Sequence, residues 1–204
     1  MRKPLVEMVN IHKSFGSVQA LRGVDFTVGY DEVVGLIGDN GAGKSTLIKI
    51  LSGIYPPDKG EIYFEGKRVS FKSHMEPMAL GIETIYQDTA LVDEMSIARN
   101  IFLGREPIRS MNLLDKKTMA KESMKILRDI GIHVDSPYIN VKSLSGGERQ
   151  SVAIARAMYF KAKLLLLDEP TSALSVKEAQ GVLEFVKQSK AQGVPSVFIT
   201  HSLH

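Results

Sequence analysis

The chain has 204 residues, a formal net charge of +3 and no cysteine, so neither disulfides nor a thiolate metal site can form. No apolar run approaches the roughly 18 residues of a membrane span, and residues 1–10 lack the long apolar segment of a secretory signal. Because the charges are dispersed, we expect no nucleic-acid partner; we expect a cytoplasmic protein that reaches a membrane only through a partner protein.

Short strands are predicted over residues 5–37. Residues 5–9 are apolar, and residues 24–28 alternate apolar with polar side chains, which is typical of an antiparallel strand with one exposed face. Residues 33–37, VVGLI, form a short apolar run rich in β-branched side chains, and we expect a buried strand there.

A glycine-rich loop follows this strand. Residues 38–46 read GDNGAGKST and match G-x-x-x-x-G-K-[ST], the phosphate-binding motif called Walker A. Its glycines let the backbone curl with N–H groups pointing inward, and the next helix adds its positive N-terminal end. A glycine-rich turn before a core helix is the alternative, but the flanking strand and helix favour a nucleotide site. The predicted nucleotide-binding residues are Gly38, Asp39, Asn40, Gly41, Ala42, Gly43, Lys44, Ser45 and Thr46.

The elements predicted after the loop are short. Apolar side chains at helical spacing in residues 47–51 predict a helix that Gly53 ends. A hairpin is predicted around Glu65-Gly66, and a short helix should end at Gly81. Residues 82–86 then predict another apolar strand.

Residues 88–160 have little strand signal and predict a helical subdomain inserted in the sheet. Ser96, Asp115 and Ser145 are each placed to cap a helix. In the second helix Met119, Met124, Leu127 and Ile130 are expected to face inward, with Gly131 as its end. We therefore divide the chain into residues 1–87 (antiparallel β-subdomain and first part of the core), 88–160 (helical subdomain) and 161–204 (the rest of the core).

The last segment predicts a strand at residues 163–168, a helix from Ser175 to about residue 191 and a strand at 194–200. The first of these strands ends in Asp168 and Glu169, the pattern called Walker B. A carboxylate there can hold the Mg²⁺ that the Ser45 hydroxyl also binds, and the next can polarise water for attack on the γ-phosphate. The alternative is an exposed acidic turn.

Residues 144–148 read LSGGE and allow two interpretations. Ser145 and Glu148 form a capping-box pattern, so the serine could simply begin a helix. Gly146 and Gly147 in the first turn each cost roughly 1 kcal/mol relative to alanine, and a cap gains nothing from them. Bare backbone at a helix N-terminus suits the close approach of a phosphate.

The chain resembles the ATP-binding cassette (ABC) family over essentially its whole length. The resemblance rests on five features in this order: GDNGAGKS, Gln87, LSGGE, LLLLDE and His201. The resemblance implies an α/β fold: a RecA-like P-loop NTPase core, an N-terminal antiparallel β-subdomain and an inserted helical subdomain. It also implies that Ser145, Gly146 and Gly147 of one cassette close over the ATP held by a second.

The resemblance assigns further roles to single residues. Phe15 stands where the family places an aromatic that stacks on adenine, Gln87 links the Mg²⁺ site to the transmembrane partner, and His201 lies beside the γ-phosphate. By their surroundings alone these would be, in turn, a core residue, a polar strand end and a loop residue. The implied cofactors are ATP and Mg²⁺. The implied catalytic set is Glu169, His201, Lys44 and Gln87, and the implied metal ligands are Ser45, Gln87 and Asp168.

The chain departs from the family pattern in two places. Ser175 replaces the aspartate that usually helps couple the two sites. The chain ends at His204, where family members continue, so we expect a truncated form in which His201 is poorly held and hydrolysis is slow.

Finer resemblance is to the ATPase subunits of bacterial monosaccharide importers of the ribose, xylose and fructose type, and it lies in residues 81–88 (GIETIYQD), 100–106 (NIFLGRE) and 152–175 (VAIARAMYFKAKLLLLDEPTSALS). The implied partners are a second cassette, permease subunits and indirectly a sugar-binding protein, at the inner face of the membrane. The alternatives are an importer of another solute, a soluble ABC ATPase acting on nucleic acid or ribosomes, and a switch that binds nucleotide without hydrolysing it.

Overall fold

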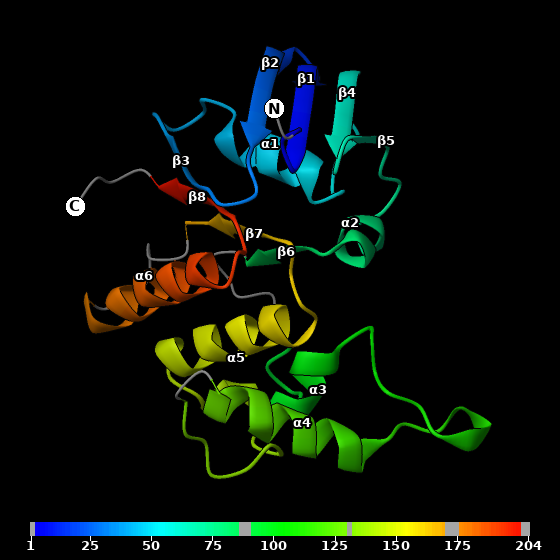
Figure 1. Ribbon diagram of the computed structural model, residues 1–204, viewed down its shortest axis with the longest axis vertical. Helices are drawn as coiled ribbons and strands as arrows, with labels where there is room; N and C mark the ends of the chain where they lie inside the picture. Colours follow the sequence, from blue (N-terminus) through cyan, green and yellow to red (C-terminus); the bar gives the residue numbers. More distant parts are fainter. Residues whose placement is uncertain (1–2, 86–90, 130–131, 170–175, 201–204) are drawn as a thin grey trace.

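The computed structural model describes residues 3–85, 91–129, 132–169 and 176–200 (Figure 1). An antiparallel sheet lies at the top of Figure 1, a parallel sheet lies beneath it, and helices α3, α4 and α5 make up the lower half. None of the helices in these ranges is long and apolar enough to cross a membrane. This mixed architecture is the fold class that the sequence predicts.

The antiparallel sheet has the strand order β2-β1-β4-β5. Its turn between β4 and β5 lies at Glu65 and Gly66, whose φ angles of 51° and 74° are those of a tight hairpin turn, as the sequence predicts. The strands are β1 (Val6–Phe15), β2 (Val18–Val28), β4 (Lys59–Phe64) and β5 (Lys67–Val69).

The parallel sheet has the order β3-β8-β7-β6. Its strands are β3 (Val33–Ile37), β6 (Ile82–Ile85), β7 (Leu164–Asp168) and β8 (Ser196–Thr200). β7 is apolar without alternation because both of its faces are buried: Leu164 and Leu166 pack toward α1 and the antiparallel sheet, and Leu165 and Leu167 pack toward α5 and α6.

The prediction that β3 is buried is wrong. β3 is the edge strand of its sheet, paired with β8 within the described residues, and alternate side chains face outward. Ile37 at its end is 54% exposed. A short apolar run gives no information about whether the strand lies in the middle or at the edge of a sheet, which depends on the strand order.

The helices are α1 (Lys44–Leu51), α2 (Met75–Leu80), α3 (Ile97–Phe102), α4 (Lys116–Asp129), α5 (Gly146–Tyr159) and α6 (Val176–Ala191), with two 3₁₀ turns at Ser110–Asn112 and Val141–Ser143. α1 packs between the two sheets, and its apolar residues join one core with both of them. α3, α4 and part of α5 surround a separate core that includes Ile101, Phe102 and Leu127.

Three predicted helix caps are present. Ser96, Asp115 and Ser145 accept hydrogen bonds from the backbone N–H three residues later, at 3.3, 3.1 and 3.3 Å. The inward face of α4 differs in one residue from the prediction, because Ser123 is fully buried while Met124 is only half-buried. Met119, Ser123 and Leu127 lie four residues apart, so they share one side of the helix. Ile130 and Gly131 lie outside the described residues.

α5 belongs to two cores at once. Ala153, Ile154 and Ala157 pack toward the parallel sheet and α6, whereas Val152 and Ala155 pack toward α3 and α4. This helix therefore connects the sheet region to the helical region. The proposed division at residues 87/88 and 160/161 stays a prediction.

Candidate functional site

The glycine loop lies between the carboxyl end of β3 and the first turn of α1. Gly41 and Gly43 have φ angles of 84° and 86°, in the left-handed region that other residues rarely adopt. Residues 39–42 are exposed, and Gly43 is the N-cap of α1. The loop therefore presents a curled backbone and a helix N-terminus to solvent, which is the arrangement that binds phosphate.

Gly43 is also restricted by its neighbours. A Cβ added there would lie 2.6 Å from the backbone oxygen of Ala20 and 2.8 Å from Leu21 Cδ2. Both of these residues are on β2, so the antiparallel sheet supports the base of the loop. The motif alone gives no sign of this contact, because it depends on residues more than 20 positions earlier in the chain.

We predict that Gly43→Ala weakens ATP binding and lowers the melting temperature. The new methyl group meets backbone, which cannot rotate away, and the positive φ adds strain of about 1 kcal/mol or more. Binding of a fluorescent ATP analogue and thermal unfolding would measure the two effects. Gly41→Ala is the matched control, since a Cβ at Gly41 meets nothing within 4 Å. Both variants put a side chain on a residue with positive φ, but only Gly43→Ala brings that side chain against β2. Equal losses in the two variants would contradict the role given to β2.

Lys44 lies inside the curl of the loop. Its Nζ donates hydrogen bonds to the backbone oxygens of Gly38 and Asp39, at 2.6 and 2.8 Å, and the residue is buried. The loop thus holds a full positive charge where the phosphates of a nucleotide would lie. This is the position that the motif predicts for it.

The structure brings Ser45 and Asp168 together. Ser45 Oγ donates to Asp168 Oδ1 over 3.2 Å, although the residues are 123 positions apart. Both predicted Mg²⁺ ligands thus lie at the carboxyl end of the parallel sheet, on α1 and β7. A hydroxyl and a carboxylate are hard oxygen donors, and the pair fits a magnesium ion. Gln87, the third predicted ligand, lies outside the described residues.

Glu169 follows Asp168 in an unusual backbone conformation. Its φ is 49°, which is uncommon for a residue with a side chain, and its N–H donates to the Ile199 oxygen at 3.2 Å. Strained backbone of this kind is concentrated at functional sites. The sequence predicts the carboxylate but not this conformation. His201 and Ser175 lie outside the described residues.

Phe15 is a surface residue at the end of β1. Its ring is 41% exposed and meets Tyr55 edge to face, with the centroids 5.1 Å apart. Lys13 Nζ lies 5.6 Å from the Phe15 centroid and pairs with Asp58 at 2.9 Å. The alternative that Phe15 is a core residue is therefore wrong. Tyr55 and Lys13, which sequence reasoning missed, keep the ring in place while leaving part of it open to stack on a base.

The LSGGE segment forms the start of α5, in the lower half of Figure 1. Ser145 and Glu148 form the predicted capping box: the Glu148 N–H bonds to Ser145 Oγ, and Ser145 N–H bonds to Glu148 Oε2 at 2.8 Å. In Figure 1 α5 lies in the lower half of the molecule, whereas α1, which follows the glycine loop, lies in the upper half. The chain therefore carries two separate helix N-termini.

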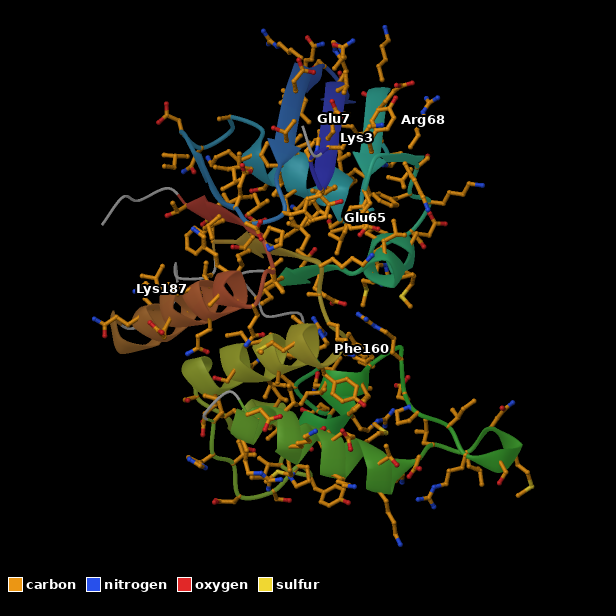
Figure 2. The ribbon with its side chains drawn as sticks, in the orientation of Figure 1. Lys3, Glu7, Glu65, Arg68, Phe160 and Lys187 are labelled. Atoms are coloured by element: carbon orange, nitrogen blue, oxygen red, sulfur yellow. The ribbon has the colours of Figure 1, made fainter. Side chains whose placement is uncertain are left out.

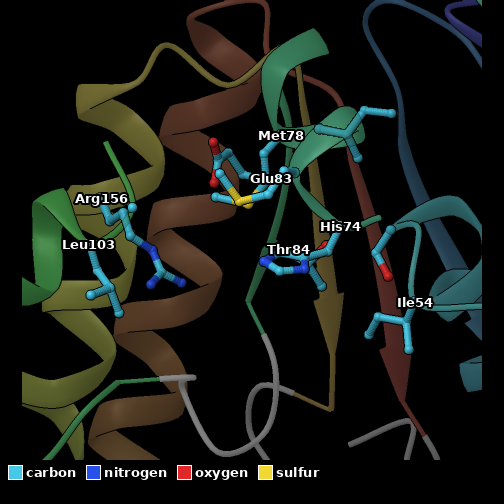
Figure 3. A pocket seen from close by; sticks show the side chains of 11 residues that line it. Ile54, His74, Met78, Glu83, Thr84, Leu103 and Arg156 are labelled. Carbon is cyan, nitrogen blue, oxygen red and sulfur yellow. The ribbon is translucent and has the colours of Figure 1, made fainter. Parts of the chain in front are cut away.

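A pocket of about 380 Å³ lies between the sheet region and the helical region (Figure 3). All three stretches that resemble sugar importers contribute to its lining: Ile82, Glu83 and Thr84 come from β6, Leu103 and Gly104 follow α3, and Arg156 is on α5. Its apolar lining consists of Ile54, Met75, Met78, Ile82 and Leu103. Glu83, inside this pocket, is almost fully buried, and burial raises the pKa of its carboxyl although the bond from Arg105 lowers it.

The whole chain is similar to several known proteins. It is 52% identical over 199 residues to the xylose/arabinose import ATP-binding protein XylG of Sulfolobus acidocaldarius, covering 98% of this chain and 79% of that protein. It is 44% identical to the fructose import ATP-binding protein FrcA of Rhizobium meliloti, covering 99% and 80%. It is 42% identical to the ribose import ATP-binding protein RbsA of Caldanaerobacter subterraneus, of which it spans 40%.

Among solved structures, the ADP conformation of MJ1267, an ATP-binding cassette of an ABC transporter, superposes with a TM-score of 0.84 at 29% identity, covering 99% of this chain and 83% of that one. The family model described as ABC transporter matches residues 21–172, a range that contains the glycine loop, the LSGGE segment and the Asp168-Glu169 pair. With the loop, the Ser45–Asp168 contact and the capped LSGGE helix, these matches establish that the chain belongs to the ABC transporter family, as one of its ATP-binding cassettes.

Proposed function

We propose that this cassette binds and hydrolyses ATP to energise a monosaccharide importer. The observation that carries the proposal is the hydrogen bond between Ser45 and Asp168, which supports a shared site for phosphate and Mg²⁺ beside the loop. The printed names of its relatives, which import xylose, arabinose, fructose or ribose, support the sugar class.

The residues divide the chemistry among them. Lys44 and the loop N–H groups neutralise the phosphates, and Ser45, Asp168 and Gln87 would hold Mg²⁺, whose charge stabilises the transferring phosphoryl group. Glu169 orients and polarises the attacking water, and His201 contacts the γ-phosphate. Phe15 stacks on the base.

A second cassette completes the site. In this proposal Ser145 and Gly147 of one copy approach the γ-phosphate held by the loop of the other, because the N-terminus of α5 is positive and its first turn has no side chains at the two glycines. The separation of the two helix N-termini in the single chain supports an arrangement between copies.

The pocket beside β6 is the proposed seat of the permease, which would hold the cassette at the inner face of the membrane. Its apolar lining suits the apolar face of a short helix. Gln87, a predicted Mg²⁺ ligand, comes three residues after Thr84, which lines the pocket on β6. A permease bound in the pocket would therefore contact residues that are close in sequence to Gln87.

The test is phosphate release by the complete cassette assembled with its permease and sugar-binding protein in liposomes. We expect release to rise when xylose, ribose or fructose is supplied, and Met78→Glu, which puts a charge in the pocket, should lose this rise but still bind ATP. Stimulation of phosphate release by DNA or ribosomes, and not by sugar, would contradict sugar import. It would favour an ABC ATPase that acts on nucleic acid or ribosomes. ATP binding without any phosphate release would favour a switch protein that binds nucleotide without hydrolysing it.

A further inference from the structure

A buried ion pair joins the sheet region to the helical region. Glu83 on β6 accepts a hydrogen bond from Arg105 Nη2 at 2.5 Å, and the Glu83 side chain is only 4% exposed. Arg105 lies just beyond α3, three residues after Phe102. Glu83 is also one of the residues that line the pocket (Figure 3).

The same arginine also contacts the end of α5. Its guanidinium carbon lies 3.9 Å from the centroid of the Phe160 ring, and Phe160 is the C-cap of α5. The Phe160 ring meets Tyr159 and Phe102 edge to face, with centroids 5.2 and 5.9 Å away (Figure 2 labels Phe160). Arg105 is therefore held between a carboxylate on the sheet and an aromatic cluster of the helical region.

The other contacts of α5 with the sheet region are mostly apolar. They involve Ala153, Ile154, Ala157 and the partly buried Met158, and Arg156 lines the pocket together with Glu83. Two of these side chains are single methyl groups, which interlock less with their neighbours than larger side chains do. Arginine, in contrast, offers a planar fork with fixed hydrogen-bond directions and a face that stacks.

The pair is not explained by stability alone. Replacing a buried ion pair by well-packed apolar residues is often neutral or stabilising, since the charges lose their hydration. Arg105 Nε is buried and, among the described residues, makes no hydrogen bond, so the desolvation of this arginine is only partly compensated. The net contribution of the pair to the free energy of folding is therefore expected to be small.

We propose that Glu83, Arg105 and Phe160 form a positioning contact that fixes the orientation of α5, and with it Ser145 and Gly147, relative to β6 and the nucleotide loop. None of the three is a catalytic residue. The contact acts through α5, whose first turn lies at the opposite end of the helix from Phe160. The expected effect of this contact on ATP hydrolysis rests on the proposed function. The expected effect on the orientation of α5 is independent of it.

The first experiment measures orientation directly. Because the chain has no cysteine, spin labels can be attached at Thr27→Cys on β2 and Lys125→Cys on α4, both exposed, without other changes. The variant Glu83→Met/Arg105→Met removes both charges and avoids the unpaired charge that either single change would leave. We expect its melting temperature to stay near that of the parent and its label-to-label distance distribution to broaden and shift.

Two further variants set the limits of this result. Glu94→Met/Lys142→Met removes an exposed ion pair of the helical region and should leave the distances unchanged. Arg105→Lys keeps the charge but loses the stacking face, and it should restore a narrow distribution only in part. A Glu83→Met/Arg105→Met protein with the parent's distance distribution would overturn the proposal, because the pair would then be dispensable for orientation.

The second experiment measures turnover in the assembly with the permease. The double variant should keep the parent's KM for ATP, since the loop is untouched, and lose roughly tenfold or more in kcat, because misplacing groups by about 1 Å is costly. Equal kcat values would overturn the functional part of the proposal. If the parent itself shows no sugar-stimulated turnover, the proposed function fails, while the label distances still decide the positioning contact.

Discussion

Replacing Glu169 by glutamine should leave ATP binding intact and slow hydrolysis roughly 10²–10⁴-fold, which is what a general base contributes. Glutamine keeps the size of the side chain and its ability to hydrogen bond, but it cannot accept the proton of the attacking water. Glu169 is suited to this role because it follows Asp168, a predicted Mg²⁺ ligand, and its backbone has a left-handed conformation. Phosphate release by the permease-bound cassette, at matched nucleotide occupancy, gives the measurement.

The matched control is Glu184→Gln, an exposed carboxylate on α6 that makes the same chemical change away from the site. It should hydrolyse ATP at the parent's rate. The Glu169→Gln protein should also form a dimer with ATP and not with ADP, since the uncleaved γ-phosphate remains to bridge the loop of one copy and Ser145 of the other. Near-normal turnover in Glu169→Gln would show that another group activates the water.

Replacing Lys44 by alanine should weaken ATP binding by about 3 kcal/mol, roughly a hundredfold in Kd, because a charge-assisted contact to phosphate is lost. The loop should keep its shape, since its left-handed glycines and its contact with β2 remain. Equilibrium binding of a fluorescent ATP analogue measures the loss, and thermal unfolding without nucleotide checks that the fold is intact.

Lys49 on the same helix supplies the control. It lies in the last turn of α1, away from the loop, and Lys49→Ala changes the net charge by the same amount. If Lys49→Ala weakens binding as much as Lys44→Ala does, the effect comes from the overall charge of the protein and not from a contact with phosphate. A Kd for Lys44→Ala within twofold of the parent's would contradict the assignment of Lys44.

Local sequence signals predicted most of the elements and the chemistry of the site. Ser96, Asp115 and Ser145 cap helices because a side-chain oxygen reaches an N–H only three residues away, so the contact depends on local sequence alone. The hairpin at Glu65-Gly66 and the curl of the loop depend equally on the backbone preferences of a few consecutive residues. The family prediction is confirmed by the family model, which matches residues 21–172, and by relatives that align with almost the whole chain.

The loop, the caps, the two carboxylates and the family could thus be predicted from the amino-acid sequence, because each depends on nearby residues or on the order of motifs along the chain. The tertiary structure alone decided that Ser45 meets Asp168, that β2 supports Gly43, that β3 lies at an edge and that Arg105 joins Glu83 to Phe160. These contacts join residues that are far apart in the chain, and their geometry follows from how the sheets and helices pack. No periodicity or local spacing records that packing, because one apolar run fits many strand orders equally well.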